Sequence, residues 1–179
     1  HPENLQAVYN APDVDITWDP IEFGGGSEGW LNWDSGENID GIGTDSSTIL
    51  DAAARFTAND LIAYEGGIVT TIKFFPREEA CDYTVKVWDT EGENILYSQY
   101  VPNPIIDQWN EIILNTPFVL ESQAEYWFGY TANTEGGYPL GHDEGPMVDT
   151  RGGYIRQNNG DWAQLTDFGL DYNWNIQAY

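Results

Sequence analysis

Apolar and polar residues alternate along much of this chain, and this period of two is the feature that most constrains its fold. In the closing segment, aromatic and aliphatic residues occupy alternate positions from Tyr172 to Ala178, while Asn173, Asn175 and Gln177 occupy the positions between them. The same alternation occurs in two further segments, CDYTVKVWD (81–89) and AEYWFGYT (124–131). Because side chains of a strand point alternately to its two faces, we expect half-buried strands with one core face and one solvent face.

Turn signals separate these strands. The chain has 19 Gly and 9 Pro, and NNGD (158–161) between GYIRQ and WAQLTD predicts a hairpin because Asn-Gly tolerates positive φ. The more continuously apolar segments 66–76 and 109–120 are typical of central strands. For 50–64 we expect a strand through Phe56 and then a short helical turn. These patterns predict an all-β sandwich with one short helical turn.

The strongly acidic composition disfavours some classes of partner. The chain of 179 residues carries 30 acidic against 6 basic side chains, a formal charge of −24, which disfavours nucleic acid and anionic lipid as partners. No apolar run approaches the roughly 20 residues of a membrane span. Cys81 is the only cysteine, so no intrachain disulfide forms, and we expect its side chain to pack at the start of a strand.

The N-terminal 28 residues differ from the rest. Residues 2–20 resemble the opening two strands of a fibronectin type III domain, with Val14, Ile16 and Trp18 in alternation. The segment IEFGGGSEG (21–29) then predicts a flexible joint. We therefore expect two parts, residues 1–28 and a sandwich at 29–179. Since the chain begins at His1 without Met, we expect it to belong to a larger multidomain protein.

Two glycine-bounded acidic segments are candidate calcium loops, because calcium takes six to eight oxygen ligands that turns commonly supply. The first is DSGENID and the second is GHDEGPMVD. The candidate ligands are Asp34, Glu37, Asn38, Asp40, Asp143 and Asp149. In the alternative interpretation, both segments are solvated turns whose side chains bond their own backbone.

Aromatic residues near turns are candidates for ligand binding, because exposed rings beside polar groups suit sugars and protein partners. We predict a long loop at 131–153, and loops of that length are often functional. The candidate ligand-binding residues on and around it are Tyr138, His142, Arg151, Tyr154 and Trp162. The turn from Trp30 to Asp40 is the second choice. Trp109, Phe128 and Trp174 are instead expected in the core.

Sequence motifs for catalysis are missing. The only histidines are His1 and His142, and no serine lies in a nucleophile-elbow pattern, so we expect no enzyme. Carboxylate pairs are common among thirty acidic residues and do not by themselves indicate a glycosidase.

From Gly29 onward the chain resembles a module of bacterial proteins that use type IX secretion, similar to the cleaved-adhesin modules of gingipain proteases. The segments that carry the resemblance are NWDSGENIDGIG, AARFTANDL, YEGGIVTTIKFFP, YTVKVWD, LYSQYV, WNEIILNTPFVL, YWFGYT, GYPLGHDEGP and YNWNIQAY. The resemblance implies a jelly-roll, galactose-binding-like β-sandwich with structural calcium. It also implies a secreted or cell-surface protein whose partner is a glycan or a host or matrix protein.

The expected function is therefore a non-catalytic recognition or adhesion module braced by calcium. One alternative is a carbohydrate-binding module of a polysaccharide-degrading system, and another is a structural spacer without a ligand. A glycan-binding module predicts at least two aromatic side chains exposed on one face with polar groups between them, whereas a spacer predicts none.

Overall fold

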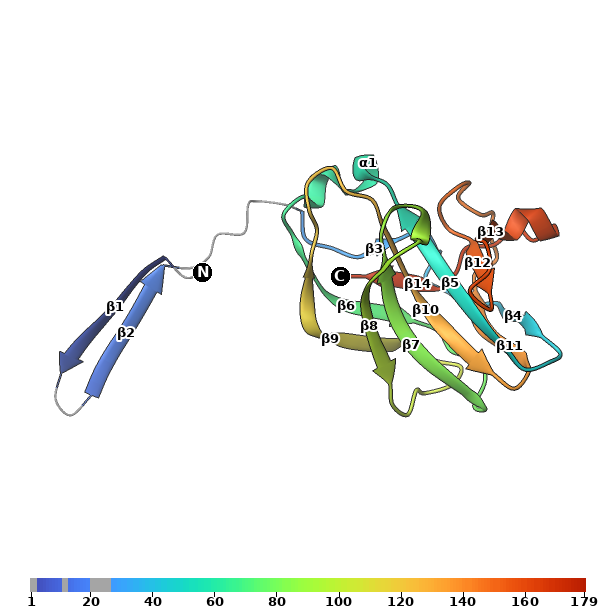
Figure 1. Cartoon of the computed structure of the whole chain (residues 1–179), viewed down its shortest axis with the longest axis horizontal. Coiled ribbons are helices and arrows are strands. Elements are labelled where there is room, and N and C mark those ends of the chain that lie inside the picture. Colours follow the sequence, from blue (N-terminus) through green and yellow to red (C-terminus); the bar gives the residue numbers. More distant parts are fainter. Residues whose placement is uncertain (1–2, 11–12, 20–26) are drawn as a thin grey trace.

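A computed structural model of the chain describes residues 3–10, 13–19 and 27–179. Strand β1 (Glu3–Asn10) pairs antiparallel with β2 (Asp13–Asp19), as Figure 1 shows. Residues 20–26, which make up most of the predicted joint, lie outside the described residues. The fibronectin resemblance of this segment stays a prediction.

The larger part of the chain is an all-β sandwich of jelly-roll type, as predicted (Figure 1). The first sheet has the order β13 (Ala163–Gln164), β12 (Tyr154–Gln157), β5 (Thr48–Phe56), β10 (Tyr126–Thr134), β7 (Cys81–Trp88) and β8 (Ile95–Val101). The second sheet has the order β3 (Leu31–Asn32), β14 (Ile176–Ala178), β6 (Ile68–Phe74) and β9 (Asn110–Val119). All strand pairs are antiparallel, and the chain crosses between the sheets from β5 to β6 to β7 and again from β8 to β9 to β10.

One hydrophobic core fills the space between the two sheets. Phe74 of β6 meets Tyr130 of β10 with 4.6 Å between ring centres, and Phe128 and Trp174 are also fully buried. Because burial of a large apolar side chain stabilises by about 1.5–3 kcal/mol, these aromatic residues hold the sheets together. Trp109 is only half-buried, and its indole Nε1 donates to the Gly36 carbonyl at 3.1 Å.

The short helical segment lies where the sequence predicts it. Strand β5 ends at Phe56, and α1 (Ala58–Leu61) and the 3₁₀ turn η1 (Ile62–Tyr64) follow. Two further 3₁₀ turns are η2 (Thr90–Gly92) and η3 (Leu165–Phe168). Among the described residues, no helix is long and apolar enough to cross a membrane.

The predicted hairpin at 158–161 is also confirmed. It joins β12 to β13, with Asn158 and Asn159 at φ of 50° and 55°, and Gly160 N donates to Gln157 O at 2.9 Å. Asparagine adopts this left-handed conformation more readily than most residues, which explains why the sequence signal is reliable here.

The predicted long loop at 131–153 is wrong. Strand β10 continues to Thr134, and β11 (Gly137–His142) then pairs with β4 (Asp40–Thr44) in a separate two-stranded ribbon. Bridges from Leu140 to Pro76 and from His142 to Trp174 join this ribbon to the second sheet. The strand signal of GYPLGH is weak because its partner, β4, lies almost one hundred residues earlier and is itself rich in glycine.

Two faces that the alternation assigns to solvent are in fact buried. Asn173, Asn175 and Gln177 are at most 7% exposed, and Trp127 of β10 is 4% exposed. Period two correctly separates the two faces of each strand, but it does not say what covers the polar face. In both places a second layer of side chains covers it.

Candidate functional site

The outer face of the six-stranded sheet carries a buried cluster of charges. The strand register places Asp51 of β5 between Thr131 of β10 and Arg156 of β12. Arg156 donates to Asp51 Oδ2 from Nε at 2.9 Å and from Nη2 at 2.8 Å. Thr131 Oγ1 donates to Asp51 Oδ1, and Lys86 Nζ lies 3.5 Å from the same oxygen. Since Asp51 is only 1% exposed, the cluster ties four strands together in a region poorly screened by water.

Aromatic side chains cover the same face beside this cluster. Trp88 of β7 and Trp127 of β10 are cross-strand neighbours, and Tyr154 packs on Trp127 with 4.3 Å between ring centres. Trp162, from the connection after β12, packs on both tryptophans at 5.4 and 5.2 Å. Its Nε1 donates to the Gly92 carbonyl at 3.0 Å, which joins the hairpin to η2. These aromatic residues form a small second core outside the sandwich.

A pocket of about 380 Å³ opens beside this second core and is called the Trp162 pocket below. Its lining residues are Glu91, Glu93, Arg156, Asn159, Gly160, Asp161 and Trp162. The Arg156 guanidinium carbon lies 4.5 Å from the centre of the Trp162 ring, so a cation covers one face of the indole. The pocket surface is mostly polar, because carboxylates and a side-chain amide provide hydrogen-bond acceptors and donors around a small exposed part of the indole.

All six lysine and arginine side chains of the chain are in ion pairs. The pairs are Arg55–Glu125, Lys73–Glu111, Arg77–Asp40, Arg77–Asp107, Lys86–Asp51, Arg151–Asp60 and Arg156–Asp51. With every cation already neutralised by a partner, the surface suits neutral or cationic ligands better than anions.

A second buried polar cluster lies at the end of the sandwich where β14 begins. The Asp143 carboxylate accepts hydrogen bonds from Ser35 N at 3.0 Å, Gly145 N at 2.8 Å, and Asn173 N and Nδ2 at 2.8 and 3.1 Å. The carboxylate of Asp34 is buried nearby. The structure therefore brings together two acidic residues that are 109 positions apart in the sequence.

Amide groups surround the Asp34 carboxylate in the same way. Gln177 Nε2 lies 3.1 and 3.2 Å from its two oxygens, Gly36 N donates at 2.9 Å, and Asn175 Nδ2 lies 3.4 Å away. Burial raises the pKa of Asp34, with Asp143 adding to the rise, while the hydrogen bonds from Gln177, Gly36 and Asn175 oppose it.

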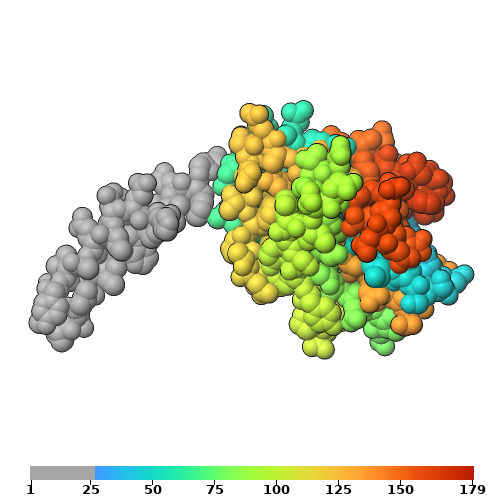
Figure 2. All heavy atoms as spheres, in the orientation of Figure 1, coloured from blue at the N-terminus to red at the C-terminus, as the bar shows by residue number. Residues whose placement is uncertain are grey.

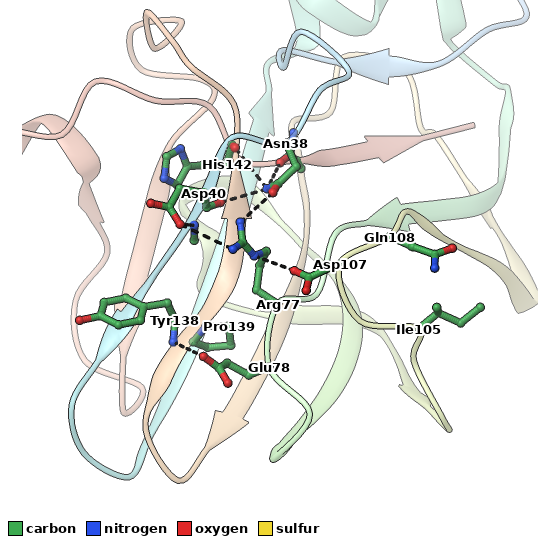
Figure 3. A network of polar contacts seen from close by, with 12 residues as sticks. Asn38, Asp40, Arg77, Glu78, Ile105, Asp107, Gln108, Tyr138, Pro139 and His142 are labelled. Carbon is green, nitrogen blue, oxygen red and sulfur yellow. Dashed lines mark hydrogen bonds and ion pairs between the residues drawn. The ribbon is translucent and has the colours of Figure 1, made fainter.

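Two other predicted metal ligands, Asn38 and Asp40, lie around Arg77, as Figure 3 shows. Arg77 Nη1 donates to Asn38 Oδ1 at 2.9 Å, and its guanidinium forms ion pairs with Asp40 at 3.7 Å and Asp107 at 2.9 Å. Asn38 Nδ2 donates in turn to Asn175 Oδ1 at 2.8 Å, which links this network to the buried cluster. Glu37 and Asp149 are exposed.

These arrangements fit N–H donors better than a calcium ion. Asp34 and Asp143 are faced by amide hydrogens, Asn38 and Asp40 by a guanidinium, and a cation would have to displace these groups. In residues 27–179, the structure has no group of three or more His, Cys, Asp or Glu side chains placed to hold one metal ion. Calcium binding stays a prediction.

Asp34 provides a test of both proton and calcium binding. Because its folded pKa lies above the ordinary 3.8, its ionised form costs stability, and this cost disappears as pH falls from neutral through the raised pKa. As pH falls over that range, the free energy of unfolding of wild type is expected to rise relative to that of Asp34→Asn. Urea denaturation at a series of pH values measures both. A constant difference between the two proteins would contradict this. Repeating the urea series in EDTA and in millimolar calcium tests the metal, since calcium binding would raise the free energy of unfolding of wild type at neutral pH.

The five predicted ligand-binding residues do not form one site. Trp162 lines the pocket described above, and Tyr154 packs in the second core behind it. Tyr138 of β11 is 53% exposed, and its ring points away from Arg77 in Figure 3. His142 is buried and stacks on Tyr172 at 4.2 Å, and Arg151 Nε binds Asp60 at 2.7 Å.

Sequence reasoning missed Asp51, Arg156, Asn159 and the η2 carboxylates. Asp51 lies between apolar residues, Leu50 and Ala52, and Arg156 is the only charged residue of β12, and this is a usable signal for a buried ion pair. No local pattern connects Glu91 and Glu93 with the hairpin, because the contact depends on strand order.

No protein-family model, no curated protein and no solved structure matches this chain. Fold and site thus define an acidic jelly-roll sandwich with a polar pocket beside a tryptophan cluster. The resemblance to type IX secreted modules remains an expectation.

Burial also affects the single thiol. Cys81 opens β7 and is half-buried, as predicted, and burial raises the pKa of its thiol to about 11. The thiol is therefore protonated at neutral pH and is a weak nucleophile there.

Proposed function

We propose that this chain is a non-catalytic recognition module of a larger secreted or bacterial surface protein, and that it binds a glycan in the Trp162 pocket. The observation that carries the proposal is the composition of that pocket. Its lining combines an indole with carboxylates, an arginine and an asparagine in about 380 Å³, close to the lower limit of roughly 300 Å³ for small-ligand pockets.

A neutral sugar fits this chemistry. Its hydroxyl groups can donate to Glu91, Glu93 and Asp161 and accept from Asn159, while a C–H group of the sugar can contact the small part of Trp162 that faces the pocket. The contacts of Trp162 with Trp88 and Trp127 keep the pocket wall rigid, which limits the entropy lost on binding. The pairing of every lysine and arginine favours an uncharged glycan over an anionic one.

Trp162→Ala is the test, with Trp109→Ala as a matched control. Both indoles are half-buried, donate to a backbone carbonyl and lie under a cation, but only Trp162 lines the pocket. A glycan panel first identifies a ligand for wild type, and calorimetry then measures its affinity. Trp162→Ala is expected to weaken binding by about tenfold or more, a loss typical of an aromatic anchor. Trp109→Ala is expected to bind as wild type does.

Equal weakening by both substitutions would contradict the assignment of the pocket. Absence of any glycan ligand would favour the spacer alternative or a protein partner.

A protein partner is the second candidate, and the edge strands favour it. β8 and β9 are the outermost strands of their sheets, and together they expose Ile95, Leu96, Ile113 and Val119, at 76% for Ile113. Apolar side chains beside strand edges are common at sites where another chain docks.

A further inference from the structure

A second cavity, lined mainly by apolar side chains, lies on the other side of the β12–β13 hairpin. It has a volume of about 380 Å³ and is called the apolar cavity below. Its walls include Ile42, Leu50, Ile155, Leu165, Phe168 and Leu170. Figure 2 shows the segments that surround it, with β4 in cyan next to the hairpin and η3 in orange and red.

The fold explains why this space is not filled. β4 belongs to the separate ribbon with β11, while η3 packs after β13 at the end of the six-stranded sheet. No strand pairing connects β4 to β12 or β13. Gly43 cannot contribute a side chain, because a Cβ there would lie 1.9 Å from the Gly137 carbonyl oxygen. The cavity therefore lies between the ribbon and the end of the six-stranded sheet.

The polar side chains of the cavity offer mainly hydrogen-bond acceptors. Thr44 donates its hydroxyl hydrogen to Ser46 O at 2.8 Å, and Gln157 donates from Nε2 to Thr48 Oγ1 at 3.0 Å. The remaining sites are thus the Thr44 lone pairs, the Gln157 carbonyl oxygen and the second N–H of the Gln157 amide. Asp161 adds a carboxylate that no hydrogen bond or ion pair joins to another residue in the described part of the chain. Among the residues that the structure describes, no lysine, arginine or histidine lines the cavity.

We infer that the apolar cavity binds a small organic amine, with an aromatic or aliphatic body among the apolar side chains and an ammonium group at the acceptors. An ammonium offers three N–H donors. Its positive charge is opposite to that of the Asp161 carboxylate and to the net negative charge of the chain. A neutral ligand without N–H or O–H donors would leave these acceptors hydrogen-bonded to water. A ligand with a carboxylate would be repelled by the negative charge of Asp161. This site goes beyond the proposed glycan site, because only Gly160 and Asp161 line both.

Three probes with one ring system separate the contributions of body and head. Tryptamine carries an ammonium, 3-methylindole is neutral, and indole-3-acetate carries a carboxylate. Calorimetry on the full chain at neutral pH is expected to show tryptamine binding about tenfold or more tighter than indole-3-acetate, with 3-methylindole between them.

Two variants locate the site. Ala163→Phe places a ring in the cavity and is expected to weaken tryptamine binding by more than about tenfold, since a filled cavity has no room for the ligand. Asp161→Asn is expected to weaken tryptamine by about two- to fivefold, as for an exposed ion pair, and to leave 3-methylindole unchanged. Glu135→Gln is the matched control, because it removes one exposed carboxylate that does not line the cavity.

Several results would overturn the inference. One is that none of the three probes binds wild type at millimolar concentration. Another is that indole-3-acetate binds as tightly as tryptamine, which would remove the ammonium from the proposal. A third is that tryptamine binds folded Ala163→Phe as it binds wild type. Thermal midpoints establish that this variant is folded, and Asp161→Asn gives an independent answer if it is not.

Discussion

Asp51→Ala is expected to lower the free energy of unfolding by about 3–5 kcal/mol, the range for removing one partner of a buried ion pair. The substitution leaves Arg156 and Lys86 without their carboxylate, and these side chains are only 10% and 13% exposed. It also removes the acceptor of the Thr131 hydroxyl. Unpaired charges in this position cost more than the ion pairs themselves contribute, because water cannot replace the lost partner. Urea denaturation measures the change.

Glu111→Ala is the matched control for this prediction. It removes the carboxylate of an exposed ion pair, 3.9 Å from Lys73 with Glu111 at 60% exposed, so a loss below about 1 kcal/mol is expected. The double variant Asp51→Ala, Arg156→Ala is expected to lose less than the sum of the two single changes, because it leaves no unpaired guanidinium. A loss below about 1 kcal/mol for Asp51→Ala would mean that water enters beneath Trp162.

Asp143→Ala has the second largest expected effect, a loss of about 3–4 kcal/mol. Four N–H groups from three segments donate to this carboxylate: those of Ser35, Gly145 and the backbone and side chain of Asn173. Because Asp143 is only 2% exposed, water cannot take the place of its carboxylate as the hydrogen-bond acceptor unless the surrounding loops move. One gain offsets part of the loss, because Asp143 raises the pKa of Asp34 and its removal eases ionisation there.

Two comparisons make this result specific. Asp149→Ala removes an exposed acidic residue from the same segment and is expected to change stability by less than about 0.5 kcal/mol. Asp143→Asn keeps one carbonyl acceptor and is expected to lose less than Asp143→Ala. If both Asp143 variants were as stable as wild type, the Asp143 carboxylate would not be what holds Asn173, just before β14, to Ser35.

The polar row of the closing segment shows how far a local pattern reaches. Alternation correctly places Trp174 and Ile176 in the core and Asn173, Asn175 and Gln177 on the opposite face. Amide side chains on one face of a strand normally indicate that this face contacts solvent. Here each amide instead donates a hydrogen bond to the carboxylate of Asp34 or Asp143. Their partners come from loops more than twenty residues away, so no window along the sequence contains the pair.

The candidate site depends on long-range geometry to the same degree. The sequence identifies Trp162 as a candidate because it follows a hairpin signal, and the structure places it in a polar pocket. The sequence does not indicate that η2 forms the opposite wall or that Arg156 covers the indole. Both follow from the order of strands β12, β5, β10 and β7 in the sheet.

By itself, the sequence determined the fold class, the hairpin at 158–161, the end of β5 at Phe56 and the acidity that restricts the ligands. These features follow from period, turn chemistry and charge, which act over a few residues or over the whole composition. Only the tertiary structure decided which acidic residues are buried, which tryptophans line a pocket and where cavities remain. Such properties depend on which strands become neighbours, because burial and hydrogen bonding are set by side chains far apart in the sequence.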